Sequence, residues 1–132
     1  MSEQTPTDIA RFWIERSHRT VDEAKLMAEN GWWDTCANRL YYACFYALSA
    51  LFKKHALPTS KHSGVRSLFF QHFVQTGKVS SEFGDLFRAL YEARREGDYE
   101  PSQILDKAEV APWIGQTEEF IKTIEQFFEE KE

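Results

Sequence analysis

Apolar residues recur along this chain at steps of three and four, the spacing that aligns side chains on one face of an α-helix. Stripes of this kind cover residues of about 7–29, 34–57, 63–75, 81–96 and 110–128. The links between the stripes are short, which makes neighbouring helices run in opposite directions. The sequence therefore predicts an all-α fold, an antiparallel up-and-down bundle of four to five helices.

Residues that favour helix ends lie at the borders of these stripes. We expect Thr7 to cap the first helix, and Ser80 or Ser81 to cap the fourth. Gly97 is expected to interrupt the fourth helix. Pro112 is expected either to confine the regular part of the fifth helix to the residues that follow it or to kink that helix.

The length and composition suit one folded domain. The chain has 132 residues, of which 42% are hydrophobic and 28% are charged. A chain of this size buries enough surface to fold without a metal or a disulfide. We expect a single helical domain over residues 1–132, with residues 1–6 disordered or extended.

The sequence also argues against membrane and secreted classes. The most apolar stretch, residues 40–52, is shorter than the about 20 residues that a transmembrane helix needs, and residues 1–8 lack the apolar core of a secretory signal. Cys36 and Cys44 would lie about 12 Å apart along one helix, too far to form a disulfide with each other. We expect a cytoplasmic protein without a metal site or a cofactor.

The charges are unevenly distributed. The net charge is −5, yet residues 35–81 contain no Asp or Glu. This block carries a set of basic residues: Arg39, Lys53, Lys54, Lys61, Arg66 and Lys78. Either most residues of the second and third helices are buried in the core, or the basic residues of these helices form an electropositive face. Such a face would attract the phosphates of a nucleotide or an RNA, or the acidic fifth helix of a neighbouring subunit.

Polar-tipped side chains form a second stripe on the helix at 34–57. Arg39, Tyr42 and Tyr46 follow one another at steps of three and four. Tyrosine in this setting suits either a base-stacking surface or the packing of a core or dimer interface. His62 and Ser63 open the next helix, whose N-terminus can be capped by Ser63 or can attract an anion.

Arg94 continues the apolar stripe of the fourth helix and therefore points toward the bundle. A buried guanidinium requires a partner. Asp98 or a residue of the second helix could supply it.

Three segments together resemble one family. They are Arg39-Leu40-Tyr41-Tyr42-Ala43-Cys44-Phe45-Tyr46-Ala47, the run from His62 to Val74, and the charged run from Arg94 to Tyr99. They are similar to the small prokaryotic branch of the HEPN domains (higher eukaryotes and prokaryotes nucleotide-binding). The resemblance implies a helical bundle that commonly dimerises and is often encoded beside a minimal nucleotidyltransferase, as a toxin and antitoxin pair.

Active members of that family are metal-independent ribonucleases. Their signature is an arginine followed, after four to six residues, by a histidine. This chain departs from the signature, because its last histidine is His72 and Tyr99 stands five positions after Arg94. The spacing does occur at Arg66 with His72 and at Arg11 with His18, although His72 would lie about 120° around a helix from Arg66.

We therefore expect a nucleotide- or RNA-binding HEPN subunit that is a homodimer, acts with a nucleotidyltransferase partner, and is catalytically weak or inactive. The alternatives are a metal-independent RNA endonuclease toxin and a structural helical adaptor. Any chemistry would involve Arg94, Asp98 or Tyr99, and the resemblance also makes Tyr99 a candidate acceptor of a transferred nucleotide. The candidate ligand-binding residues are Arg39, Tyr42, Tyr46, His62, Ser63, Arg66, His72 and Arg94.

Overall fold

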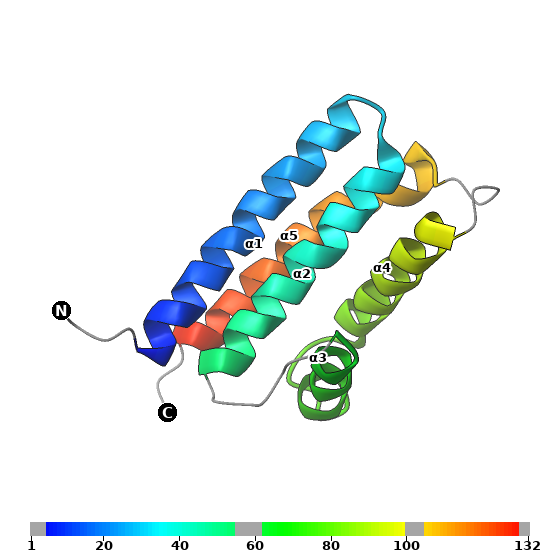
Figure 1. Ribbon diagram of the computed structural model, residues 1–132. Helices are drawn as coiled ribbons and strands as arrows, with labels where there is room; N and C mark the ends of the chain where they lie inside the picture. The colour runs from blue at the N-terminus through cyan, green and yellow to red at the C-terminus, as the bar shows by residue number, and fades with distance from the viewer. Residues whose placement is uncertain (1–4, 55–61, 100–104, 130–132) are drawn as a thin grey trace.

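The computed structural model describes residues 5–54, 62–99 and 105–129, and this part of the chain is helical and contains no strand. The elements are α1 (Pro6–Glu29), α2 (Trp33–Lys54), α3 (His62–Phe69), a π-helical turn η1 (Phe70–Val74), α4 (Ser81–Tyr99) and α5 (Lys107–Glu129). Figure 1 shows α1, α2, α4 and α5 running alternately up and down, with α3 lying across the end of the bundle where α2 ends. The predicted all-α antiparallel bundle is confirmed.

Helix α2 lies at the centre of the bundle and contacts α1, α3, α4 and α5. The apolar stripe predicted for it is fully buried: Ala37, Leu40, Tyr41, Cys44, Leu48 and Leu51 are all 0% exposed. Helix α1 packs closely on this helix, and the buried hydroxyl of Ser17 donates a hydrogen bond to the carbonyl of Ala43 at 2.7 Å. Both cysteines are free and buried.

A stack of aromatic rings joins α3, α4 and α5. The ring centroids of Phe69 and Phe120 are 5.5 Å apart, and Phe87 lies 5.7 Å from Phe69. The ring of Tyr41, on α2, stacks on Phe87 at 5.6 Å. Ring pairs at these distances add about 0.5–1.5 kcal/mol to the gain from burial. The stack therefore holds α2 and α4 in register at the level of Tyr41.

The first helix begins earlier than its expected cap. Thr5, rather than Thr7, is the N-cap, and its side-chain oxygen accepts a hydrogen bond from the backbone N–H of Asp8. The carboxylate of Asp8 in turn accepts from the backbone N–H of Thr5. Pro6 follows as the first helical residue, where its missing N–H costs nothing. Ser80 caps α4 as expected, since its hydroxyl accepts from the N–H of Glu82.

Two expected breaks do not end a helix. Helix α4 continues through Gly97 to Tyr99, because a glycine inside a helix costs only about 1 kcal/mol. Helix α5 begins before Pro112, at Lys107, where the carboxylate of Asp106 accepts from the N–H of Glu109. Residues 1–4, 55–61 and 100–104, which include Lys61 of the acid-free block, lie outside the described residues.

Helix α4 also approaches η1 closely. A side-chain carbon at Gly84 would lie 2.9 Å from the ring of Phe70 and 3.3 Å from the methyl groups of Val74. A larger residue at this crossing would therefore require the Phe70 ring or the two segments to shift. The crossing places the segment that contains α3 and η1 beside the first half of α4, which forms one wall of the site described next.

Candidate functional site

The guanidinium of Arg94 packs against three tyrosine rings. Its central carbon lies 5.1 Å from the ring centroid of Tyr41, 5.8 Å from that of Tyr91 and 6.0 Å from that of Tyr42. At these distances the negative face of the ring attracts the cation. We expected Arg94 to find its partner in Asp98 or in the second helix. Aromatic rings of α2 and α4 surround it, and the side chain of Asp98 lies outside the described residues.

Two further arginines extend this arrangement. The guanidinium of Arg66, on α3, lies 4.6 Å from the ring centroid of Tyr91, and that of Arg39, on α2, lies 5.2 Å from the centroid of Tyr42. Three helices thus contribute to one group of side chains. We call it the arginine–tyrosine cluster: Arg39, Arg66, Arg94, Tyr41, Tyr42 and Tyr91.

The cluster carries positive charge that is only partly neutralised. Nη1 of Arg39 lies 3.4 Å from Oε1 of Glu23. Within the described part of the chain, Arg66 and Arg94 form no ion pair with a carboxylate. Nε of Arg94 is buried and lacks a hydrogen-bond partner among the same residues. Among the described residues, no direct carboxylate contact therefore neutralises the charge of these two guanidiniums.

Burial fixes the protonation of the tyrosine beneath Arg94. Tyr41 is 0% exposed, and this burial raises the pKa of its phenol well above its ordinary value, while the Arg94 guanidinium opposes the rise. The phenol is consequently neutral at physiological pH. It supplies a ring face to Arg94 and does not act as a base.

A polar hollow adjoins the cluster between α3, η1 and α4. Its volume is about 540 Å³, within the range of pockets that hold small ligands. The described residues that line it are Arg66, Ser67, Phe70, Gln71, Gln75, Arg88 and Glu92. Two guanidiniums, two amides and a hydroxyl offer hydrogen-bond donors there, while Glu92 contributes a carboxylate and Arg88 pairs with Asp85 at 3.5 Å. This set of donors suits a phosphate or a nucleobase edge.

The structure brings together part of the predicted ligand-binding set. Arg39, Tyr42, Arg66 and Arg94 lie in the cluster, and the ring of Tyr46 lies 6.0 Å from that of Tyr42. His72 lies apart from them: it is exposed on η1, and the described residues that line the hollow do not include it. The side chains of His62, Ser63, Asp98 and Tyr99, although on helices, lie outside the described residues.

Several residues of the site were not predicted as such. Tyr41 and Tyr91 lie within the apolar stripes of the second and fourth helices, yet their rings contact the guanidiniums of Arg94 and Arg66. The step of three residues from Tyr91 to Arg94 was a signal for such a contact, since it places both side chains on one helix face. Gln71 and Arg88 carried no comparable signal, because they contribute only to the hollow.

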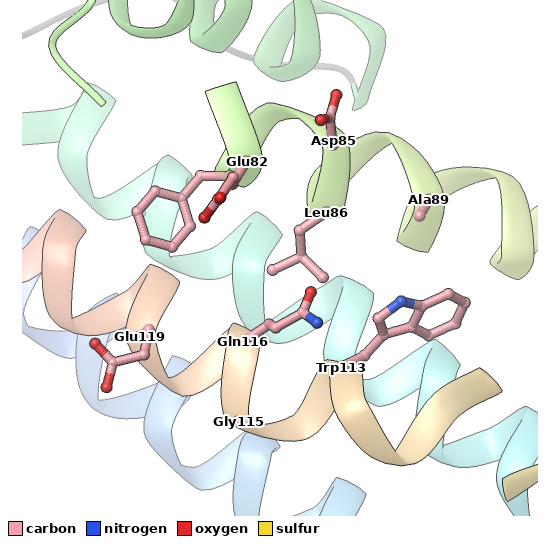
Figure 2. Close-up of a pocket in the computed structure, with 9 residues that line it drawn as sticks. Glu82, Asp85, Leu86, Ala89, Trp113, Gly115, Gln116 and Glu119 are labelled. Atoms are coloured by element: carbon pink, nitrogen blue, oxygen red, sulfur yellow. The ribbon is translucent and has the colours of Figure 1, made fainter. Parts of the chain in front are cut away.

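A second hollow lies between α4 and α5 and has a different chemistry. This groove has a volume of about 780 Å³, and Figure 2 shows Leu86 and Gln116 on its facing walls. Three carboxylates line it, those of Glu82, Asp85 and Glu119. Their charge repels phosphate, so this groove does not suit a nucleotide.

The described residues contain no group of three or more His, Cys, Asp or Glu side chains placed to hold a metal ion. None of the helices in the same part of the chain combines the length and the apolar character needed to cross a membrane.

Comparison with known proteins identifies relatives of the chain. A family model described as "HEPN domain" matches residues 10–127. A protein of Thermotoga maritima named "UPF0332 protein" is 38% identical over 122 residues, which cover 92% of each chain. Two proteins of Methanocaldococcus jannaschii, both named "Putative toxin", are 26% and 28% identical over 73% and 89% of this chain and 65% and 87% of their own lengths.

Proposed function

The chain belongs to the HEPN family, and on that premise we propose that it is a nucleotide- or RNA-binding subunit of a toxin–antitoxin-type system. The arginine–tyrosine cluster is the observation that carries this proposal. Arg66 and Arg94 present positive charge without a carboxylate partner among the described residues, beside tyrosine rings and a hollow of about 540 Å³. Phosphate oxygens pair with guanidiniums, and bases stack on aromatic rings.

We propose binding rather than cleavage as the activity of this site. A general base for RNA cleavage needs a pKa near neutrality, and histidine is the residue that usually supplies it. No histidine follows His72 in the sequence. His18 and His72, the histidines whose side chains are described, are both exposed and do not contribute to the cluster. The phenol of Tyr41 is too weakly acidic to take the role.

The partners belong to the same proposal. The names of the two Methanocaldococcus relatives support a toxin-like role, and the family resemblance supports a homodimer that pairs with a nucleotidyltransferase. In such a pair the HEPN subunit would bind RNA until its partner restrains it.

A binding titration tests this function. The purified protein is added to a fluorescent oligouridylate at about 50 mM and about 200 mM salt, and polarisation is measured. We expect Arg94→Ala and Arg66→Ala each to weaken binding roughly tenfold or more, because each removes a charge-assisted contact to phosphate. Arg11→Ala is the matched control, since Arg11 is exposed on α1 and lines a different hollow, between α1 and α5. It should change the affinity by less than about twofold.

The same samples distinguish the alternatives. Intact RNA after incubation supports binding without cleavage, whereas cleavage that Arg94→Ala abolishes would support the endonuclease. Equal affinities of the wild type, Arg94→Ala and Arg66→Ala would contradict the proposed site. A wild type that binds no RNA would favour the structural adaptor.

A further inference from the structure

Aromatic rings continue from the cluster across α2 and onto α1. The ring centroid of Tyr42 lies 6.0 Å from that of Tyr46, which lies 5.4 Å from that of Trp13. Trp13 in turn contacts the ring of Phe12 edge to face at 5.4 Å. We call this row the ring ladder: Tyr42, Tyr46, Trp13 and Phe12. It shares Tyr42 with the cluster, so the two groups of side chains are contiguous.

The far end of the ring ladder lies at the surface. Phe12 is 57% exposed, although a phenylalanine gains about 1.5–3 kcal/mol when it is buried. Scattered exposed apolar residues are common and need no explanation. Phe12 differs from them because it ends a row of rings that begins at the candidate site.

Arginine side chains lie beside the rings of the ring ladder, as they do in the cluster. Arg16, one turn after Phe12 on α1, lies 5.8 Å from the ring centroid of Tyr46. Within the described part of the chain Arg16 forms no ion pair, and the pairing of Arg39 with Glu23 is the one contact with a carboxylate along the row. Ring faces and unpaired positive charge along one line are the two features that bind single-stranded nucleic acid without sequence preference.

The charge favours a polyanion over a second copy of the chain. A two-fold contact through this face would gather the same unpaired guanidiniums of both copies around one axis. Like charges that meet in an interface oppose association. Phosphates spaced along a strand would neutralise them instead.

We propose that the RNA-binding surface extends beyond the cluster along the ring ladder to Phe12 and Arg16, so that the ligand is a single strand of several nucleotides. This inference rests on the proposed function. It assigns to α1 a role in binding, with bases against Phe12 and Trp13 and a phosphate at Arg16.

Ligand length provides the test. Affinities of the full chain are measured for a fluorescent uridine dinucleotide and for an oligouridylate of about 12 nucleotides, a length comparable to known single-strand sites. Phe12→Ala and Arg16→Ala should each weaken binding of the longer RNA at least about fivefold, the loss expected for one stacked base, and should leave dinucleotide binding unchanged. Arg94→Ala should weaken both ligands. Arg11→Ala, on the same helix as Phe12, is the control and should weaken neither.

The outcomes separate this inference from the function on which it rests. If Arg94→Ala weakens both ligands while Phe12→Ala and Arg16→Ala change nothing, the extension is wrong and the cluster remains the site. If neither RNA binds the wild type, both proposals fail. Light scattering of the same samples measures the oligomeric state. If Phe12→Ala dissociates a dimer without changing the affinity for RNA, this face is an interface between copies, and the extension is wrong.

Discussion

Two opposing effects set the contribution of Arg94 to the stability of the fold that surrounds it. Its contacts with tyrosine rings each gain about 0.5–2 kcal/mol. Its buried Nε, which lacks a hydrogen-bond partner within the described part of the chain, costs about 1–3 kcal/mol. The three contacts together gain about 1.5–6 kcal/mol, so the unpaired donor offsets part of this gain. A side chain of similar length without a polar atom would avoid the cost of the unpaired donor, so packing alone does not require an arginine here.

Replacing Arg94 by methionine should separate stability from binding. Methionine has similar length, fills the space among the rings and removes the unpaired donor. We expect the free energy of unfolding of Arg94→Met, measured by urea denaturation, to lie within about 1 kcal/mol of the wild-type value, while RNA binding falls as it does for Arg94→Ala. A loss of several kcal/mol would show that the guanidinium is mainly structural.

The sequence identified candidate residues of this site, but it did not show which of them contact one another. The helical steps placed Arg39 and Tyr42 on one face and directed Arg94 inward, as the structure has them. Periodicity within one helix says nothing about the register between two helices, so it could not show that Tyr41 and Tyr91 lie under Arg94. The change from α- to π-helical turns at Phe70 was equally invisible in the pattern.

Helix α5 shows how local signals compete within an element. Pro112 removes a backbone hydrogen bond and was expected either to confine the regular helix to the residues that follow it or to kink it. The Asp106 cap and the fully buried Val110 nevertheless hold turns of helix before it. Capping and burial together outweigh the cost of the proline. The five stripes thus predicted the five α-helices of the described residues, whereas the end of α4 and the start of α5 did not follow the local signals at Gly97 and Pro112.

Pro112→Ala should therefore stabilise the protein. Pro112 is exposed inside α5, so alanine restores the hydrogen bond without removing a buried side chain. We expect the free energy of unfolding to rise by about 1–3 kcal/mol, read from the shift of the urea midpoint at constant slope. A decrease would mean that the ring of Pro112 supports the start of α5 in a way that alanine cannot replace.

In the molecule as a whole, three weakly acidic groups of the described residues are buried in the core. Burial raises the pKa of the Cys36 thiol to about 11, and it raises the pKa of Cys44 and of Tyr41 still further above their ordinary values. All three lie on α2, the central helix. Each stays protonated in the folded protein at a pH where it ionises in the unfolded chain.

Stability should consequently fall in alkaline solution. Above about pH 9 the unfolded thiols lose protons that the folded protein keeps, so the unfolded state is favoured as pH rises. Each group contributes up to about 1.4 kcal/mol per pH unit until the pH reaches its folded pKa, and Tyr41 joins above about pH 10. Urea denaturation at several pH values measures the slope. Cys36→Ala should show a shallower fall, and a wild-type stability that stays constant between about pH 9 and about pH 10 would contradict the assignment.

The two buried, unpaired thiols have a practical consequence. The chain holds no other cysteine. A cysteine introduced at the surface is therefore the one exposed thiol with which a maleimide dye can react. Arg19, exposed one turn beyond Arg16 on α1, offers such a position close to the proposed path of the strand. A fluorophore attached at Arg19→Cys could then follow the arrival of RNA in real time, with the native cysteines left in place.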